Sequence, residues 1–258
     1  MADGMVNTSL KGKVSEEEWN ARVDLAAMYR LTALYGWDDL IFTHISHRVP
    51  GPEHHFLINP YGFLFEEITA SSLVKIDLDG NIVEDTPYMV NPAGFTIHSA
   101  VHAAHDTAHV VMHLHTDDGV AVSCQKEGLL PLSQTAMIAR HDLAYHDYEG
   151  VALDHGERER LVADLGDKSL MMLRNHGTMT LGRNAAECFM RMFFLERACS
   201  MQVRALTAGR DGVLEGTKEV QDVVKGQSNP EGMAVVSQRL AWPALLRRLD
   251  RVSPGYAD

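Results

Sequence analysis

Residues 15–35 show the first regular pattern of hydrophobic and polar positions. Apolar residues recur there at the three- and four-residue spacing of one helix face, and Ser15 with Glu18 forms a capping-box pattern at the start. Gly36 follows the last apolar position and is the kind of residue at which helices end. The pattern predicts a helix that starts after Ser15 and stops before Gly36.

Residues 184–208 carry the longest helical pattern, with Asn184 at the N-cap and Glu187 at the capping-box position. This helix is apolar over more than one face, which suits either a buried core helix or a subunit contact. Shorter helices are predicted over residues 93–105, around 118–126 and at about 236–250.

Between these segments the pattern changes to that of strands. In residues 41–49 apolar and polar side chains alternate, and residues 56–59 form a short apolar run. Residues 73–83 have the pattern of two strands joined by an Asp-Gly-Asn turn. Residues 109–116 and 169–182 are further extended segments. Strands that cluster between hairpin turns and alternate with helices predict an α/β fold, a single domain with a central, mostly antiparallel sheet flanked by helices.

The chain shows no internal repeat and no low-complexity tract. We expect an N-terminal arm over residues 1–14, one domain over 15–209, and a C-terminal tail over 210–258 that is richer in Gly, Asp and Glu and holds the short last helix. A length of 258 residues suits this organisation.

Charge and composition narrow the classes of function. Lys and Arg number 23 against 35 Asp and Glu, a net charge of −12, which argues against binding nucleic acid or an anionic membrane. No apolar run reaches the length of a membrane span, and the N-terminus lacks the apolar stretch of a secretion signal. Three scattered cysteines favour a reducing compartment, so a cytoplasmic location is expected.

Histidines on one predicted strand form the main candidate functional group. His113 and His115 stand two positions apart, so strand alternation turns both imidazoles to one face. Two such imidazoles can bind one transition metal ion, although the short pattern also occurs as two buried, hydrogen-bonded histidines. His176, at the end of an apolar run, is a candidate third ligand. Three imidazoles leave coordination positions open, which is typical of catalytic metal sites.

A further series of histidines, at positions 98, 102, 105 and 109, follows a helical spacing. The series fits either a metal-binding stripe or a solvated or half-buried helix face, and the helix face is favoured because the spacing does not require a ligand. His98, near the start of the predicted helix and close to Asn91, is kept as a candidate active-site group. His44 shares a strand face with Ser46 and is either a surface residue or part of a pocket.

Several longer segments, in one order along the chain, carry a family resemblance: GWDDLIFTHIS, FLINPYGFLFEEITASSLVKIDLDGNIV, NPAGFTIHSAVHAAH, VVMHLHT, YHDYEG and LMMLRNHG. Over about residues 17–208 the chain resembles the class II aldolase/adducin family. The segments INPYG, TASSLVKI, GLLPLS, AYHDYEG and RNHG are especially similar to the head domain of adducin, an actin-cytoskeleton protein of animals.

The resemblance implies an α/β domain, a divalent metal ion held by three histidines, and cyclic tetramers with active sites between neighbouring subunits. It places the metal ligands at His113, His115 and His176. Zinc is the expected ion, with iron, manganese, nickel or cobalt as alternatives, because imidazole suits several transition metals.

Some positions differ from the sugar-phosphate aldolases that the chain resembles. Their Pro-Ser-Ser-Glu stretch corresponds to Asn91-Pro92-Ala93-Gly94, which replaces two phosphate-binding serines and a proton-transferring glutamate. A Gly-Asn phosphate contact corresponds to Thr43-His44, and a threonine near the next turn to Asn59. These losses weaken the case for a phosphorylated substrate and for the usual proton abstraction.

We therefore expect a divalent-metal-dependent lyase of the aldolase or decarboxylase type, which acts on a small, non-phosphorylated hydroxy or keto acid through a metal-stabilised enolate. His98 and Tyr256 are the expected catalytic residues, and His44, Asn59 and Asn91 the expected substrate-binding residues.

Two other functions stay open. An iron-dependent oxygenase on the same scaffold is one, because imidazole ligands accept iron as well as zinc. A non-catalytic, adducin-like interaction module is the other, although the sequence lacks the basic segment with which adducin binds its partners. The expected partners are a small-molecule substrate and further copies of the chain in a homotetramer, with no nucleic acid and no membrane.

Overall fold

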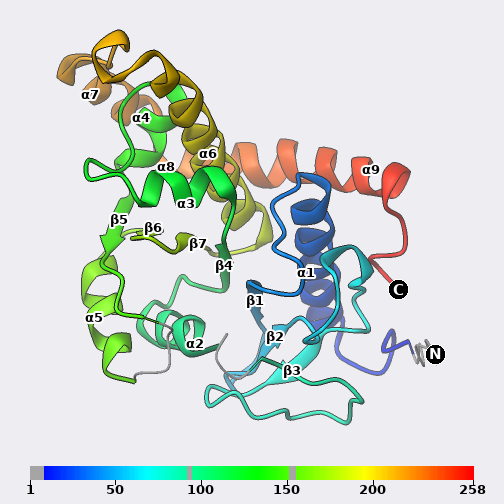
Figure 1. The fold of residues 1–258 in the computed structure, drawn as a ribbon. Helices are drawn as coiled ribbons and strands as arrows, with labels where there is room; N and C mark the ends of the chain where they lie inside the picture. Colours follow the sequence, from blue (N-terminus) through cyan, green and yellow to red (C-terminus); the bar gives the residue numbers. More distant parts are fainter. Residues whose placement is uncertain (1–8, 92–94, 151–154) are drawn as a thin grey trace.

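The computed structural model describes residues 9–91, 95–150 and 155–258. One sheet lies at its centre, with helices on both faces (Figure 1). The strands are β1 (His44–Arg48), β2 (Phe56–Ile58), β3 (Val74–Ile76), β4 (Val110–Leu114), β5 (Leu143–His146), β6 (Leu170–Leu173) and β7 (Gly177–Gly182). Their order is β3-β2-β1-β4-β7-β6-β5, and β5–β6 is the parallel pair among otherwise antiparallel neighbours. The predicted α/β domain with a mostly antiparallel sheet is confirmed.

Helices connect and cover these strands. The α-helices are α1 (Glu16–Leu34), α2 (Phe95–Ala104), α3 (Asp117–Ser123), α4 (Gln134–Arg140), α5 (His155–Leu165), α6 (Ala185–Ala205), α7 (Lys218–Gln227), α8 (Pro230–Val236) and α9 (Trp242–Val252). Short 3₁₀ turns η1 (Phe65–Glu67), η2 (Leu206–Ala208) and η3 (Arg210–Gly212) and the π-helical turn η4 (Ser237–Ala241) complete the described elements. Among the described helices, none has the length and apolar character that crossing a membrane requires.

Strand alternation in β4 separates the two halves of the core. Met112 and Leu114 pack in a hydrophobic cluster with residues of α1, α6 and α9, whereas Val111 packs in a cluster with α2 and α5. His113 has the parity of Val111 and therefore lies on the α2 side of the sheet. The sheet thus separates the first predicted ligand from the large core cluster around α1.

The register of β1 against β4 brings further polar residues to the same face. His44 lies opposite His113, and Ser46 lies opposite Val111. Because directly paired residues of antiparallel strands point to the same side, all of these side chains face α2. The structure therefore collects the polar positions of both strands beneath one helix.

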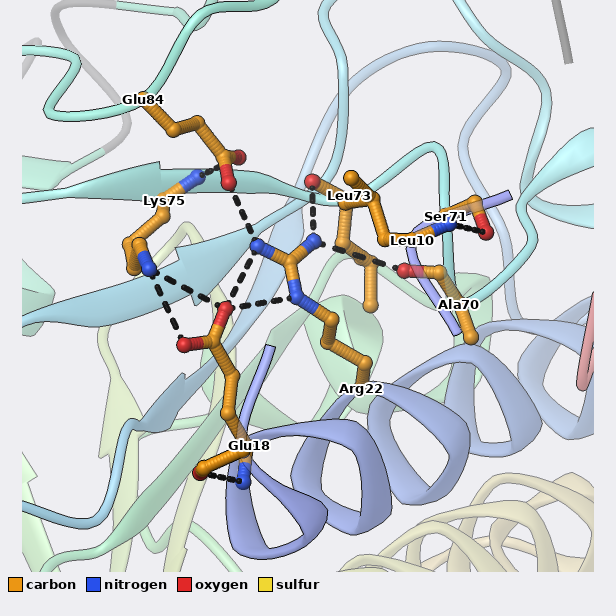
Figure 2. Close-up of polar contacts among 9 residues, drawn as sticks. Leu10, Glu18, Arg22, Ala70, Ser71, Leu73, Lys75 and Glu84 are labelled. Atoms are coloured by element: carbon orange, nitrogen blue, oxygen red, sulfur yellow. Dashed lines mark hydrogen bonds and ion pairs between the residues drawn. The ribbon is translucent and has the colours of Figure 1, made fainter. Parts of the chain in front are cut away.

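The start of α1 confirms one half of the predicted capping box. The Ser15 Oγ atom accepts a hydrogen bond from the Glu18 backbone N–H at 3.1 Å. The Glu18 carboxylate does not complete the box, because it binds Arg22 and Lys75 (Figure 2). These ion pairs, one within α1 and one to Lys75 in β3, replace the contact that would complete the capping box.

Arg22 is fully buried and is the centre of this charged cluster. Its guanidinium donates to Glu18 Oε1 at 2.9 Å, to Glu84 Oε2 at 2.6 Å and to the Leu73 carbonyl oxygen at 2.8 Å (Figure 2). Lys75 in β3 also binds Glu18. The cluster fastens α1 to the β3 edge of the sheet.

The C-terminal region has more structure than the sequence pattern indicates. The predicted helix at about 236–250 corresponds to η4 and α9, but α7 and α8 were not predicted. The N-cap residues Thr217 and Asn229 each accept a hydrogen bond from a backbone N–H of the following turn. Such caps are a helix-start signal in the sequence, but the Gly-, Asp- and Glu-rich composition of this segment favours a tail. Trp242 and Leu249 are buried in the same cluster as α1. The region after residue 209 therefore packs on the domain.

Candidate metal centre

Three imidazoles meet between the end of β4 and the turn that joins β6 to β7. His113 lies in β4, His115 follows it, and His176 lies in the turn before β7, the strand that pairs with β4. Their ligand atoms all lie within 4.8 Å of one another. The Nε2 atoms of His113 and His115 are 2.9 Å apart, and those of His113 and His176 are 3.3 Å apart. The structure therefore brings the three predicted residues together.

The backbone around His176 explains how the turn reaches β4. Asn175 has a φ of +56°, a left-handed conformation that Asn adopts more readily than most residues. A Cβ atom at Gly177 would lie 2.2 Å from the Leu114 carbonyl oxygen. A side chain at this position would force the two segments that carry the imidazoles apart, so the glycine allows their close approach.

The nitrogen separations suit ligands of a single metal ion. Zinc binds histidine nitrogen at about 2.0–2.1 Å, so two nitrogens that subtend an angle of about 90–110° at the ion lie about 2.9–3.4 Å apart. The separations of 2.9 Å and 3.3 Å fall within this range. The spacing of the imidazoles therefore fits a divalent metal ion.

Hydrogen bonds determine which ring nitrogens face the centre of the group. The Nδ1 atom of His113 lies 3.0 Å from the Thr178 carbonyl oxygen, which only accepts, so Nδ1 carries the proton. The Nδ1 atom of His115 lies 3.1 Å from Asp39 Oδ2 and donates to that carboxylate. The His113 Nε2 atom and, in its neutral form, the His115 Nε2 atom then present lone pairs 2.9 Å apart, and one cation can bind both. Carbonyl and carboxylate partners of this kind are typical of metal-binding histidines.

Burial keeps the imidazoles of His113 and His176 neutral. Desolvation and, second, the neighbouring histidines lower the pKa of His113 well below its usual value, and the same causes lower the pKa of His176 to about 4. Neutral imidazole is the form that binds transition metals. The donor set, the outer hydrogen bonds and the charge state all fit a divalent ion held by His113, His115 and His176.

His44 and His98 lie beside this group. The ring centroids of His44 and His98 are 4.2 Å apart, and those of His44 and His113 are 6.3 Å apart. The Nε2 atoms of His44 and His98 are buried and have no hydrogen-bond partner among the described residues. Desolvation lowers the pKa of His44 to about 3 and that of His98 well below its usual value. The expectation of a solvated or half-buried helix face was wrong for His98 and His102, because both are buried against the sheet.

Asn59 and Tyr256 have partners elsewhere. The Asn59 Oδ1 atom lies 2.9 Å from the Tyr29 hydroxyl, in the contact between α1 and the sheet. Tyr256 belongs to the hydrophobic cluster of α1 and donates its hydroxyl hydrogen bond to Asp250 Oδ1 at 3.0 Å. That cluster occupies the face of the sheet opposite His113, so the structure does not bring Tyr256 to the imidazoles of its own chain.

The positions that differ from the sugar-phosphate aldolases are only partly described. Asn91 is a half-buried residue at the end of the described loop before α2. Pro92, Ala93 and Gly94 lie outside the described residues. Thr43 has a φ of +62°, and its hydroxyl is buried without a hydrogen-bond partner among the described residues.

Sequence reasoning missed Glu196, which joins the two segments that carry the imidazoles. Its Oε2 atom accepts from the Thr116 hydroxyl at 2.5 Å, and its Oε1 atom accepts from the Thr178 hydroxyl at 2.6 Å. Thr116 follows His115, and Thr178 stands two positions after His176. Burial raises the pKa of Glu196 to about 7, against the effect of the two hydroxyls. Glu196 stands four positions after Met192 and three before Cys199, and a charged residue at that helical spacing from apolar residues is the signal that could have revealed it.

A cavity of about 600 Å³ opens beside His115. Residues 35–39 and 115–118 line it, together with Glu196 and Arg197 of α6. Its volume is that of a small-molecule site. His115 is the one of the three imidazoles that lines this cavity, so the group borders it through His115.

The family model described as Class II Aldolase and Adducin N-terminal domain matches residues 23–203. The chain belongs to this family. The matched range contains the three imidazoles, His44, His98 and Glu196, whereas Tyr256 lies beyond it. Membership supports metal-dependent lyase chemistry as the general class of activity.

Relatives of the family extend over most or all of the chain. A Caulobacter vibrioides protein, named for the class 2 aldolases without a substrate, is 68% identical over 100% of both chains. An aldolase II superfamily protein from Pseudomonas syringae has a TM-score of 0.91 and 51% identity, over 97% of this chain and 100% of that one. Mouse alpha-adducin is 48% identical, but the match covers 72% of this chain and 26% of adducin.

A more distant structure shares the fold. The L-fuculose 1-phosphate aldolase from Glaciozyma antarctica has a TM-score of 0.80 and 24% identity, over 95% of this chain and 94% of that one. The likeness extends beyond the family-matched range and therefore includes part of the region after residue 209.

Proposed function

We propose that this chain is a divalent-metal-dependent lyase of the aldolase or decarboxylase type, which cleaves a carbon–carbon bond in a small, non-phosphorylated hydroxy or keto acid. The observation that carries the proposal is the group of three imidazoles whose Nε2 atoms lie 2.9 Å and 3.3 Å apart. His113, His115 and His176 would hold the ion, with zinc as the first candidate. When bound, a divalent ion supplies Lewis-acid stabilisation of the negative charge that develops on a substrate oxygen.

The residues beside the imidazoles have roles in handling the proton and the substrate. The His98 Nε2 atom is buried and has no partner among the described residues, so it is the candidate group for accepting a hydrogen bond, and with it a proton, from the substrate. His44 lies between His98 and His113 and orients the substrate from the sheet side. Asn91 remains a proposed substrate-binding residue. The partners of Asn59 and Tyr256 favour structural roles for both.

A non-phosphorylated substrate agrees with the charge of the site. His44 stands where the resemblance puts a phosphate contact, and its pKa of about 3 leaves it uncharged at neutral pH. A phosphate dianion gains most from cations or from several converging N–H donors, neither of which His44 supplies. We therefore expect an uncharged end of the substrate at this position.

We also propose that the chain forms a homotetramer with active sites between subunits. The loop that carries Asp39 supports this, because it exposes Leu40 and Phe42, with 65% and 45% of their surface accessible. Such apolar side chains next to a site are typical of a contact with a neighbouring chain. Native mass spectrometry of the purified protein would show a tetramer, and a monomer over a range of concentrations would contradict this part of the proposal.

Metal analysis combined with a substrate screen tests the main proposal. We expect about one divalent ion per wild-type chain, and loss of that ion in His176→Ala. His109→Ala, at an exposed histidine, is the matched control and should keep the ion. Turnover is screened under argon with hydroxy and keto acids, and product carbonyl compounds are measured.

Each outcome of this test assigns the chain to one class. Anaerobic turnover that depends on the ion supports the lyase. Turnover that occurs only with oxygen and iron would replace it by an oxygenase. A wild-type chain that binds no zinc, manganese, iron, nickel or cobalt would contradict the metal site and favour the interaction module.

A further inference from the structure

A chain of hydrogen bonds runs from the backbone through two residues to His98. The His102 Nδ1 atom lies 2.6 Å from the Ala108 carbonyl oxygen. The His102 Nε2 atom lies 2.7 Å from Ser46 Oγ, and the same oxygen lies 2.7 Å from the His98 Nδ1 atom. Ser46, His98 and His102 are all buried, so water does not compete for these contacts.

The direction of each hydrogen bond follows from the carbonyl group at the end. A carbonyl oxygen only accepts, so the His102 Nδ1 atom carries a proton. Burial lowers the pKa of His102 to about 3, and its ring is therefore neutral with a lone pair on Nε2. The Ser46 hydroxyl must donate its single proton to that lone pair. Towards His98 the serine oxygen can then only accept, which requires a proton on the His98 Nδ1 atom.

The other nitrogen of His98 consequently has a lone pair. This Nε2 atom is buried without a partner among the described residues, beside His44 and on the face of the sheet that carries His113. An unpaired buried acceptor is costly, and a ligand that donates a hydrogen bond removes the cost. A carboxylate or phosphate oxygen at this position has no proton to donate, so its lone pairs would repel the lone pair of the His98 Nε2 atom.

We propose that Ser46 and His102 are positioning residues that hold His98 in the Nδ1–H tautomer, so that its Nε2 atom accepts a hydrogen bond from a substrate hydroxyl group. This inference rests on the proposed function for the identity of the site, and it narrows the substrate class to hydroxy acids whose hydroxyl group lies on the His98 side. Neither Ser46 nor His102 touches the substrate.

The tautomer can be measured without metal or substrate. In the metal-free protein with ¹⁵N-labelled histidine at neutral pH, we expect a protonated Nδ1 and a bare Nε2 nitrogen for His98, assigned by the signals lost in His98→Gln. Ser46→Ala should abolish this preference, and Ser46→Thr, which keeps the hydroxyl, should retain it. Ser123→Ala removes another buried serine hydroxyl, one that donates to the Val120 carbonyl, and should change nothing at His98. A protonated Nε2 nitrogen in the wild type would overturn the proposal.

A pair of small acids tests the acceptor role. Glycolate and methoxyacetate both carry a carboxylate, but only glycolate offers a hydroxyl donor. For the zinc-loaded wild type we expect glycolate to bind about 2- to 12-fold more tightly, the range of one net hydrogen bond. In Ser46→Ala and His98→Phe this ratio should fall to about one, while zinc binding itself persists. Equal binding of the two acids by the wild type would overturn the acceptor role, even where zinc binding supports the proposed function.

Discussion

Acidification should destabilise the metal-free protein through histidines that are buried in the neutral form. His102 is the clearest case, because it is 1% exposed and its pKa is about 3, below the value of about 6.5 in an unfolded chain. Between these two values the unfolded chain binds more protons than the folded one. The stability that His102 contributes is therefore complete above pH 6.5 and is lost as the pH falls.

The magnitude follows from the two pKa values. The cost of keeping His102 neutral is about 0.2 kcal/mol at pH 7 and about 2 kcal/mol at pH 5. Because pH 5 lies well above the folded pKa, the result depends almost entirely on the pKa in the unfolded chain. His44, whose pKa is also about 3, adds a loss of similar size.

Urea unfolding at pH 7, 6 and 5 in the presence of EDTA measures this effect. The fall in unfolding free energy between pH 7 and pH 5 should be smaller by about 2 kcal/mol in His102→Gln than in the wild type. Ser46→Ala is the control, because it removes a hydrogen bond of His102 but leaves the titrating ring. It should lower stability at every pH and keep the wild-type pH dependence. An unchanged fall in His102→Gln would refute the burial argument.

Three further changes test other parts of the structure. Arg22→Met leaves the Glu18 carboxylate buried with fewer partners and should cost about 3–5 kcal/mol in urea unfolding, and a loss below about 1 kcal/mol would show that the cluster in Figure 2 is not stabilising. Asp39→Asn removes the charged acceptor of His115 and should weaken zinc binding about 10- to 100-fold by competition titration, with unchanged affinity as the contradicting result. Glu196→Leu removes the carboxylate that accepts from the Thr116 and Thr178 hydroxyls, and calorimetry should show a lower melting temperature together with weaker zinc binding. Weaker zinc binding alone would mean that Glu196 does not stabilise the fold.

Most of the strands and the His113–His115 pair were predictable because their signals are local, whereas β5, α4 and α5 were not predicted. Strand alternation alone places His113 and His115 on one face, and the Ser15 and Asn184 N-caps mark the helix starts where the structure has them. His176 was a candidate from its own position after an apolar run, and the family resemblance then placed it in one site with the other two, from which it is distant in sequence. Its approach to β4 depends on β4–β7 pairing, a contact that the sequence does not display.

The failures have tertiary causes. The series at positions 98 and 102 has the spacing of a helix stripe, and spacing alone does not tell whether a polar stripe faces water or a polar face of the sheet. The β1–β4 register puts Ser46 on the face of the sheet beneath α2, and the polar stripe of the helix packs against that face and not toward water. Glu18 fits the capping box by position, yet Arg22 and Lys75 provide stronger partners. Glu196 escaped notice because its partners, Thr116 and Thr178, belong to two separate segments.

The chemistry of the candidate site and the acid sensitivity of the fold share one cause. Desolvation keeps His44, His98, His113 and His176 neutral, and only neutral imidazoles bind a metal ion or accept a hydrogen bond. A metal ion that binds the folded chain adds stability in proportion to the logarithm of its concentration over its dissociation constant. Protons act in the opposite direction on the same nitrogens. The midpoint of acid unfolding should therefore move to lower pH as zinc is added, and a midpoint that does not respond to zinc would separate the metal site from the buried histidines.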